Sequence, residues 1–407
     1  MTNLAIEAAY GQRPHLRECV FKRGLRRVEA RVGAEGGVQR LSLSSGGYLY
    51  EREGAVDRQQ ASEATEQRSL RVIPGQLVVN PMWLTGGSIA VSRLRGAVSP
   101  DYRVFALDDS IEPRFLHHLL RSQPYRDQYD LFVRANTTFD RRIQQEDLDQ
   151  LPLWLPERQE QRRIADFLDD RVARIDRIIV ARRQQQDLLE NRLLAQIRQG
   201  VAGVLDERQV TASSPIPWLE KMSCEARVAK LARVLTMQRG VDLTADEQRP
   251  GNVPVITTAG VTGWHDVAIA TGPGVVIGRY GSVGSVHWVE GDYWPHNTTL
   301  YLKDAHGNSL RWAYYLLRSF PYAALQARAA VPGVNRNDMA AEDVPIIPRP
   351  LQAQVADVLD ARVMDAAQGN AAVAGSIELL TEYKQSLITA AVTGDLDVTT
   401  AGSGIPG

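Results

Sequence analysis

A long segment of this chain occurs twice. Residues Gln161 to Asp206 align with residues Gln352 to Asp397 without a gap, at a constant offset of 191 positions. A shorter match precedes each copy, because Leu119–Tyr125 corresponds to Leu316–Tyr322 at an offset of 197. The sequence therefore predicts that the whole half-chain is duplicated, with small insertions and deletions between the matching segments.

Length and composition favour two folded domains. A chain of 407 residues is too long for one ordinary core, and a composition of 44% hydrophobic and 23% charged residues is typical of a folded soluble protein. No apolar run approaches the roughly 18 residues of a membrane helix, and the N-terminus lacks the layout of a signal peptide. We expect a cytoplasmic protein with no membrane partner. The two cysteines, Cys19 and Cys224, have no second thiol or paired histidines nearby, so we expect no metal site.

The charge of the chain is uneven although its net value is only −1. Between Arg13 and Arg40 there are eight Lys or Arg against three Glu, and between Lys221 and Arg239 there are five against one. The two basic stretches stand at the start of the two halves, where they would form two phosphate-contacting surfaces. Two solvated polar faces explain the same pattern about equally well.

Each half reads as a β-rich block that is closed by a short amphipathic helix. Short β-type runs are separated by Gly and Pro, and the short helices are expected over 113–121 and 310–318. The expected strands lie at 76–80, 88–92 and 102–105 in the first half, and at 253–256, 274–278, 285–289 and 299–302 in the second.

A long helix follows each block. From Pro156 no further Pro or Gly occurs until Gly200, so about 44 residues can form one helix of roughly 65 Å. Its apolar residues step by four and three as in a coiled coil, with a break at 182–187; they are Leu168, Val172, Ile175, Ile179, Leu189 and Leu193. The second copy follows Pro348 and Pro350, and Gly369 and Gly375 weaken its middle.

These elements predict an α+β fold, with two β-rich globular domains joined by two long helices that pack as an antiparallel coiled coil. A complete block lies between the helices, so they can return past each other around a pseudo-two-fold axis. The predicted domains are 1–155 and 207–347, the helical spacers are 156–206 and 348–397, and a flexible tail covers 398–407. A solitary structural rod is the simpler alternative.

Catalytic motifs are weak in this sequence. Asn80-Pro81-Met82-Trp83 is close to the Asn-Pro-Pro-aromatic loop of amino-methyltransferases, but no glycine-rich strand and turn for S-adenosylmethionine precedes it. There is no Gly-x-x-x-x-Gly-Lys-Ser/Thr phosphate loop. Glu382-Tyr383-Lys384 has the Glu-x-Lys spacing of a nuclease, but it lies within the predicted helix, so we interpret it as a solvated face.

Recognition chemistry is better represented. The segment 278–284 combines an arginine that can bind guanine or phosphate, a tyrosine, and glycines that allow close backbone approach. The segment 292–299 adds amide and hydroxyl groups. The polar loops 136–142 and 332–337 carry arginines at similar places before the two long helices. Any one of these segments is equally well explained as a turn with a structural arginine, but their paired occurrence favours recognition.

Several of these segments resemble the specificity subunit of type I restriction-modification systems. The similar residues are Glu160–Asp169 with Arg174-Ile175-Asp176, the ending Ala391–Asp397, and Gly278–Ser282 with Asp292–Pro295. The resemblance covers almost the whole chain and is least clear in the first 70 residues. In the second helix, Pro350-Leu351-Gln352 replaces the usual Glu-Gln pair.

The resemblance implies a non-catalytic subunit with two target-recognition domains, each reading half of a bipartite, asymmetric double-stranded DNA target. The helices would set the spacer, and a helix of about 65 Å bounds it at roughly 19 base pairs. The implied partners are two methyltransferase subunits and restriction subunits with translocase activity. The chain itself would hold no cofactor, whereas S-adenosylmethionine, ATP and Mg would be held by the partners.

Two sets of site residues follow as candidates. The DNA-binding candidates are Arg93, Arg95, Arg141, Arg142, Arg279, Tyr280, Ser282, Asn297, Asn335 and Arg336. The candidates for partner docking on the helices are Ile164, Phe167, Leu168, Ile175, Leu189, Val355, Leu359, Leu380 and Leu387. Two other functions stay open: a coiled-coil scaffold with protein-binding blocks, and an enzyme that acts through Asn80–Trp83.

Overall fold

The chain forms two compact units in the computed structural model. The structure describes residues 3–10, 16–35, 37–52, 63–133, 142–206, 208–247, 249–327 and 333–401. Unit 1 consists of Met1–Ala181 with Ser376–Gly407, and unit 2 consists of Arg182–Gly375. Each unit therefore contains a globular part and segments of both long helices. The domain boundaries expected from the sequence remain predictions.

Unit 1 is built on a four-stranded antiparallel sheet. The order is β2 (Leu25–Val28), β9 (Arg103–Leu107), β6 (Leu77–Val79) and β7 (Ile89–Val91). The central strand β6 is buried at all three positions, which suits its Leu-Val-Val sequence. The other pairs are β1 (Arg17–Val20) with β10 (Pro152–Leu155), β3 (Leu41–Leu43) with β4 (Leu49–Glu51), and β5 (Leu70–Val72) with β8 (Gly96–Val98).

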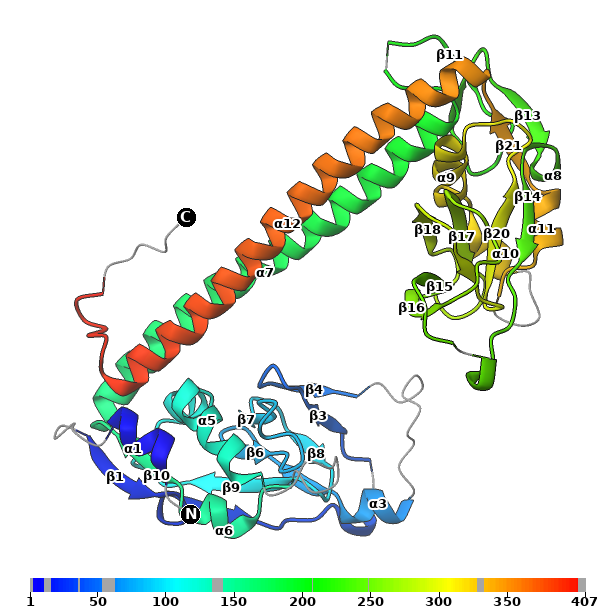
Figure 1. The fold of residues 1–407 in the computed structure, drawn as a ribbon. Coiled ribbons are helices and arrows are strands. Elements are labelled where there is room, and N and C mark those ends of the chain that lie inside the picture. Colours follow the sequence, from blue (N-terminus) through cyan, green and yellow to red (C-terminus); the bar gives the residue numbers. More distant parts are fainter. Residues whose placement is uncertain are drawn as a thin grey trace. The chain divides into compact units, whose positions relative to one another are not determined.

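Short helices cover and connect these strands (Figure 1). They are α1 (Leu4–Tyr10), α2 (Phe21–Gly24), η1 (Gly33–Glu35), α3 (Glu63–Arg68), α4 (Pro113–Leu119), α5 (Gln123–Phe132) and α6 (Gln145–Asp149). One buried cluster joins α1, α4 and α5 to the sheet and to the long helices, with Tyr10, Phe105, Phe115 and Tyr129 among its largest side chains. Burying aromatic rings of this size makes a large contribution to the stability of a small domain.

Unit 2 contains a second four-stranded antiparallel sheet. Its order is β14 (Thr236–Arg239), β20 (Thr299–Asp304), β17 (Gly274–Gly278) and β18 (Val286–Val289). In both sheets the order along the sheet is first, last, second and third in the chain. The remaining strands are β15 (Val253–Thr257) between β16 (Gly260–His265) and β19 (Trp294–Pro295), β11 (Thr211–Ser213) with β12 (Lys221–Ser223), and β13 (Arg227–Lys230) with β21 (Asp343–Ile346).

The helices of unit 2 are short as well. They are α8 (Leu231–Val234), η2 (Ala245–Glu247), α9 (Leu310–Arg318), α10 (Tyr322–Gln326) and α11 (Arg336–Ala341). Helix α9 begins at the N-cap Ser309, and its apolar residues include the fully buried Trp312. The predicted short strands and short helices are present in both units, and the fold is a mixed α and β structure with sheets and long helices, as predicted.

The long helices are α7 (Arg158–Val201) and α12 (Arg349–Thr393). In unit 2, Gly200 faces Leu359, and a Cβ at this position would lie 2.9 Å from Leu359 Cδ2. Gly369 faces Leu189 at 3.7 Å by the same measure. Residue numbers rise along one helix as they fall along the other, so the two segments are antiparallel. Helix α12 continues through Gly369 and Gly375, because its contacts with α7 offset their low helix propensity.

The same helices pack together within unit 1. Ile164, Leu168 and Ile175 of α7 share a buried cluster with α12 residues that include Leu387 and Ala391. An ion pair joins Lys384 Nζ to Asp176 Oδ1 at 2.6 Å. Lys384 is the lysine of the Glu-x-Lys string, and its ammonium group is used between helices, in agreement with the interpretation that this string is not a nuclease site.

A buried glutamine ties the start of each long helix to a globular part. Gln161 Oε1 accepts a hydrogen bond from Glu112 N at 2.8 Å, and its Nε2 donates to Pro156 O at 2.9 Å. Gln352 Oε1 accepts from Ser309 N at 2.8 Å, and its Nε2 donates to Ile347 O at 3.0 Å. Glu112 and Ser309 are the N-cap residues of α4 and α9. Each carboxamide thus satisfies a buried backbone N–H at a helix start.

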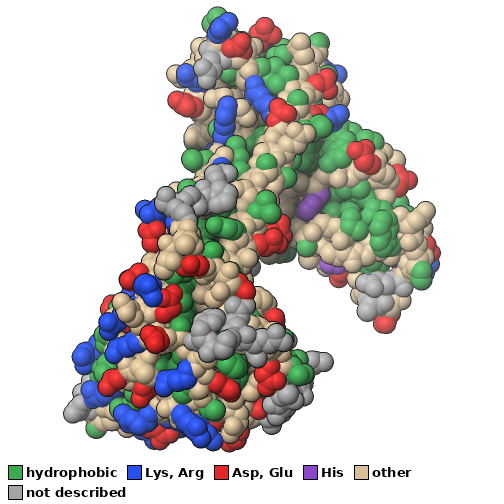
Figure 2. All heavy atoms as spheres, turned by 90° about the vertical axis from the view of Figure 1, so that its left-hand side faces the viewer, with side chains coloured by type: hydrophobic (Ala, Val, Ile, Leu, Met, Phe, Trp, Pro, Cys, Tyr) green, Lys and Arg blue, Asp and Glu red, His purple; other side chains and the backbone are tan. Residues whose placement is uncertain are grey.

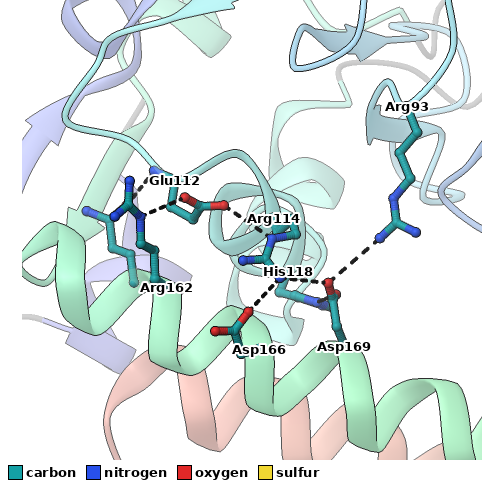
Figure 3. Close-up of polar contacts among 8 residues, drawn as sticks. Arg93, Glu112, Arg114, His118, Arg162, Asp166 and Asp169 are labelled. Atoms are coloured by element: carbon teal, nitrogen blue, oxygen red, sulfur yellow. Dashed lines mark hydrogen bonds and ion pairs between the residues drawn. The ribbon is translucent and has the colours of Figure 1, made fainter.

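An aspartate about two helical turns further on, eight residues after the glutamine, pairs with the short helix in each junction. Asp169 Oδ1 lies 3.0 Å from His118 Nε2, and its Oδ2 lies 3.3 Å from Arg114 Nη1 (Figure 3). In unit 2, Asp360 accepts from the Tyr315 hydroxyl at 2.5 Å and pairs with Arg311. Burial raises the pKa of Asp169, but the hydrogen bond and charge of His118, with the charges of Arg93 and Arg114, outweigh it, so the pKa is lowered overall.

We predict that Gln161→Ala and Gln352→Ala each lower the free energy of unfolding by about 1–3 kcal/mol, because a buried N–H and a buried carbonyl lose their partners. Guanidinium denaturation followed by circular dichroism measures the change. The exposed neighbours give matched controls, since Gln159→Ala and Gln354→Ala should change stability by less than about 0.5 kcal/mol. Equal effects at all four glutamines would contradict this role for the buried pair.

Candidate nucleic-acid interface

Corresponding turns leave the central strands of the two sheets. In unit 1 the connection from β6 to β7 is closed by a hydrogen bond from Asn80 N to Ser88 O at 3.0 Å. In unit 2 the connection from β17 to β18 is closed by one from Gly278 N to Ser285 O at 2.8 Å. We call these connections turn 1 (residues 81–87) and turn 2 (residues 279–284). The antiparallel register places the end of β2 and the start of β9 beside turn 1, and the end of β14 and the start of β20 beside turn 2.

A second backbone hydrogen bond holds each turn to the segment that precedes a later helix. Pro81 O accepts from Ile143 N at 3.0 Å in unit 1. Arg279 O accepts from Val334 N at 3.0 Å in unit 2. The two turns are thus supported by the same kind of contact, although their side chains differ. Their backbones are fixed while much of their side-chain surface stays exposed.

Turn 2 presents an arginine and a tyrosine together. The Arg279 guanidinium lies over the Tyr280 ring, with its carbon 4.5 Å from the ring centroid, and Tyr280 is 39% exposed. Arg279 N donates to Thr298 O at 3.0 Å, so the turn also rests on the segment that carries Asn297. Gly281 and Gly284 have positive φ values of 72° and 81°, which other residues rarely adopt. A guanidinium held against an aromatic ring suits a contact to a phosphate or to guanine.

The other predicted residues of unit 2 lie close to turn 2. Asn335 caps α11 by accepting a hydrogen bond from Asn337 N at 2.9 Å, and Arg336 beside it is exposed. Ser282 is exposed within the turn itself. The Asn297 side chain donates to Asp242 Oδ1 at 2.6 Å, so Asp242 already occupies one of its donor hydrogens. The structure therefore brings the described parts of all three predicted segments of unit 2 to one end of the sheet, with Arg239 at the end of β14 as an addition.

Turn 1 begins with the string that is close to a methyltransferase loop. Asn80 is buried, and its Oδ1 accepts a hydrogen bond from Met82 N at 3.1 Å. The amide therefore shapes its own turn, as asparagine commonly does, and is not presented to a bound base. Trp83, in contrast, is 53% exposed. The string occupies the place that Gly278–Gly281 occupies in unit 2, and this explains why it follows a buried strand.

Three guanidinium groups gather beside turn 1. Burial, followed by the positive charges of Arg27 and Arg142, lowers the pKa of Arg103 to about 10. Arg103 donates to Ile143 O at 2.9 Å, and Arg142 pairs with Asp101 at 3.3 Å. With a pKa of about 10, Arg103 remains charged near neutral pH. This cluster would attract a phosphate. Arg103 was not among the residues predicted from the sequence, and Arg27 was predicted only as one member of the basic stretch between Arg13 and Arg40.

The remaining arginine candidates of unit 1 do not join this cluster. Arg93 and Arg95 follow the end of β7, which is the opposite end of the sheet from turn 1. Arg93 lies 3.8 Å from Asp169 on α7 (Figure 3). Arg141 lies outside the described residues. The sequence does not show which strands pair, so it could not predict that Arg93 and Arg95 lie at the opposite end of the sheet from Arg142.

The residues proposed for partner docking are packed within this chain. Six of them are buried: Ile164, Leu168, Ile175, Val355, Leu359 and Leu387. Phe167 and Leu380 are partly buried against the core of unit 1, and Leu189 faces Gly369. These side chains hold the helices to each other and to the globular parts, and the six buried ones are not available to a partner. The coiled-coil pattern identifies residues that are buried, but not what covers them.

The surface charge matches the near-neutral composition. On the face shown in Figure 2, Lys and Arg side chains of unit 1 are interspersed with Asp and Glu. On this face, positive and negative side chains are mixed and no wide basic patch is formed. In the described part of the chain, none of the helices combines the length and the hydropathy needed to cross a membrane.

Solved structures share this fold. A chain from a study of the "complex assembly and conformational transition of the type I R-M system" matches with a TM-score of 0.70 and 18% identity, covering 94% of this chain and 99% of that chain. The HsdS subunit from Thermoanaerobacter tengcongensis matches at 18% identity with a TM-score of 0.47, over 94% and 98% of the two chains. The S subunit of the type I restriction-modification system from M. genitalium matches at 13% identity with a TM-score of 0.37, over 92% and 96%.

The first of these matches establishes the fold. The chain has the fold of a component of a type I restriction-modification system, as the resemblance in its sequence predicts. No protein-family profile and no curated protein matches the sequence.

We predict that Arg279→Ala lowers sequence-specific DNA affinity by roughly 5-fold to 150-fold, which corresponds to the loss of about 1–3 kcal/mol for one bidentate contact. The loss should be confined to one half of a target, and fluorescence anisotropy with each half randomised in turn measures it. Arg233→Ala is the matched control, because Arg233 is an exposed arginine of α8, next to the opposite end of β14. A uniform loss for both halves would indicate a general electrostatic role.

Proposed function

We propose that this chain is the DNA sequence-specificity subunit of a type I restriction-modification complex. One observation carries the proposal: each unit ends its four-stranded sheet in an exposed turn that is held by corresponding backbone hydrogen bonds and flanked by arginines. The shared fold supports it at the level of architecture. Two recognition turns with different side chains, turn 1 and turn 2, suit a bipartite, asymmetric target in double-stranded DNA.

In this function the chain binds DNA and its partners carry out the reactions. Two methyltransferase subunits would supply S-adenosylmethionine, and restriction subunits with translocase activity would supply ATP and Mg. The cytoplasm is the compartment in which such a complex would work. Phosphate contacts from partners would also compensate for the low net charge of this chain.

We infer that partners dock on apolar side chains that the helices leave exposed. In unit 1 these are Ile178, Val180, Leu379 and Tyr383, and in unit 2 they are Leu188 and Met364. Exposed apolar side chains on adjacent helical turns are typical of protein contacts. We propose these exposed residues as the candidates for partner docking, in place of the buried residues that the heptad pattern indicated.

The experiment that tests this function selects duplexes from a randomised DNA library with the full chain at low salt, where phosphate contacts are strongest. We expect enrichment of two short sequence blocks separated by an unspecified spacer. Enrichment of no sequence would reject the proposal and favour a coiled-coil scaffold with protein-binding blocks. Radiolabelled methyl transfer by the chain alone would instead favour an enzyme.

We further propose that the two long helices, as an antiparallel coiled coil within an internal repeat, set the spacer between the blocks. Removing seven residues from each helix would shorten each by about 10 Å, which equals roughly three base pairs. We predict that the selected spacer shortens by about this amount while both blocks keep their sequences. Repeating the library selection with this variant measures the change.

A suitable control for the spacer prediction replaces seven exposed helix residues with alanine without changing the length of either helix. That variant should retain the original spacer. Altered block sequences in the shortened variant, or an unchanged spacer, would show that the helices do not set the distance.

A further inference from the structure

We propose that unit 1 contacts its half of the DNA target through an aromatic surface formed by Trp83, Tyr48 and Tyr50. This inference rests on the proposed function and deepens it, because it assigns the specificity residues of unit 1. The three side chains are 53%, 59% and 47% exposed. Duplex DNA is the occupant, and the contacts are apolar contacts to the bases, in contrast with the guanidinium of turn 2.

Two separate segments meet to form this aromatic surface. Trp83 belongs to turn 1, whereas Tyr48 and Tyr50 belong to the hairpin of β3 and β4. The Arg121 guanidinium donates to Gly87 O at the end of turn 1 and to Ser45 O in the hairpin, at 3.3 Å for Nη2. The Tyr48 and Tyr50 ring centroids are 6.1 Å apart, so both rings lie on the same side of the hairpin.

Arg121 is a positioning residue for this surface. Burial, followed by the charge of Arg126, lowers the pKa of its guanidinium to about 10, so it remains charged at neutral pH and keeps its donors. Gly47 leaves space for it, since a Cβ there would lie 2.2 Å from Arg121 Cζ. A partly buried arginine with backbone acceptors in both segments fixes them more firmly than loop contacts alone.

The exposure of these rings fits a binding surface better than a folding role. Large aromatic side chains stabilise a fold when they are buried, and these three are held in the open on a well-supported turn and hairpin. Arg27, Arg103 and Arg142 lie at the same end of the sheet and would attract the DNA backbone. Aromatic and basic groups together suit nucleic acid, whereas the aromatic groups alone would not distinguish it from a protein partner.

Turn 2 provides an internal comparison. Turn 1, which carries Trp83, occupies the place of turn 2, which carries Arg279 and Tyr280, because the closing hydrogen bonds of the two turns correspond. The two units therefore present different chemistry at one structural position. Apolar contacts from one unit and guanidinium contacts from the other would select different sequences.

The test compares variants of the full chain by library selection and by anisotropy on the selected duplex. Trp83→Ala and Tyr48→Ala should each weaken binding at least about tenfold, from lost apolar contact, and should relax selection in one block only. That block must differ from the one affected by Arg279→Ala. Trp83→Phe should retain most of the selection, because an aromatic ring remains.

Trp264→Ala is the matched control, because Trp264 is a 57% exposed tryptophan of β16 in unit 2. It should leave the block read by unit 1 unchanged. Wild-type selection in both blocks by Trp83→Ala and Tyr48→Ala would overturn the inference, and so would a loss in the block that depends on Arg279. A wild-type chain that selects no sequence would instead reject the proposed function itself.

Discussion

A helix of 44 residues with an apolar stripe along most of its length cannot be covered by one small globular part. The rest of this structure depends on how that stripe is buried. In each unit, a segment of α7 and a segment of α12 cover each other and add their apolar side chains to the core of the globular part. Gly200 permits close packing against α12, since a Cβ at this position would lie 2.9 Å from Leu359 Cδ2. Neither helix is therefore an appendage, and each contributes to both compact units.

The junction between the long helix and the globular part contains the same polar contacts in both units. A buried glutamine and, eight residues later, an aspartate meet the N-terminus and the first turns of a short helix in both units. Buried polar groups of this kind are costly unless all are satisfied, so they admit one geometry. The short helix, and with it the sheet on which it packs, takes a defined orientation on the long helix.

Much of this architecture could be predicted from the sequence, because it depends on local periodicity. The long helices, the short helices that precede them and three of the four strands of each sheet follow from the spacing of apolar residues and from Pro and Gly. The first strands of the two sheets, β2 and β14, were not predicted. Sequence reasoning failed where an answer required knowing what covers a residue. Leu168 and Leu359 belong to an apolar stripe that either a partner or this chain could cover. Only the structure shows that this chain itself buries them.

The candidate site shows the same contrast between residues that a local sequence pattern identifies and residues that only the three-dimensional structure brings together. Arg279 and Tyr280 were identifiable because recognition chemistry is concentrated in one glycine-rich segment. The corresponding segment of unit 1 resembles an enzyme motif, so its tryptophan was interpreted only as part of that motif and not as a DNA-binding candidate, although it also follows a buried strand. Arg27 and Arg103 are distant in the sequence and come together only because β2 and β9 are neighbours. Arg93 was grouped with the DNA-binding candidates for the same reason. Only the pairing of β6 with β7 shows that it lies at the end of the sheet opposite turn 1.

Asn80 and the backbone hydrogen bonds at both ends of turn 1 hold its shape without help from the exposed side chains. Substitutions at positions such as 82, 83 and 85 therefore cost the fold little. Mutation can explore new side chains there one at a time, so under the proposed function the DNA sequence that the chain prefers could change without loss of stability.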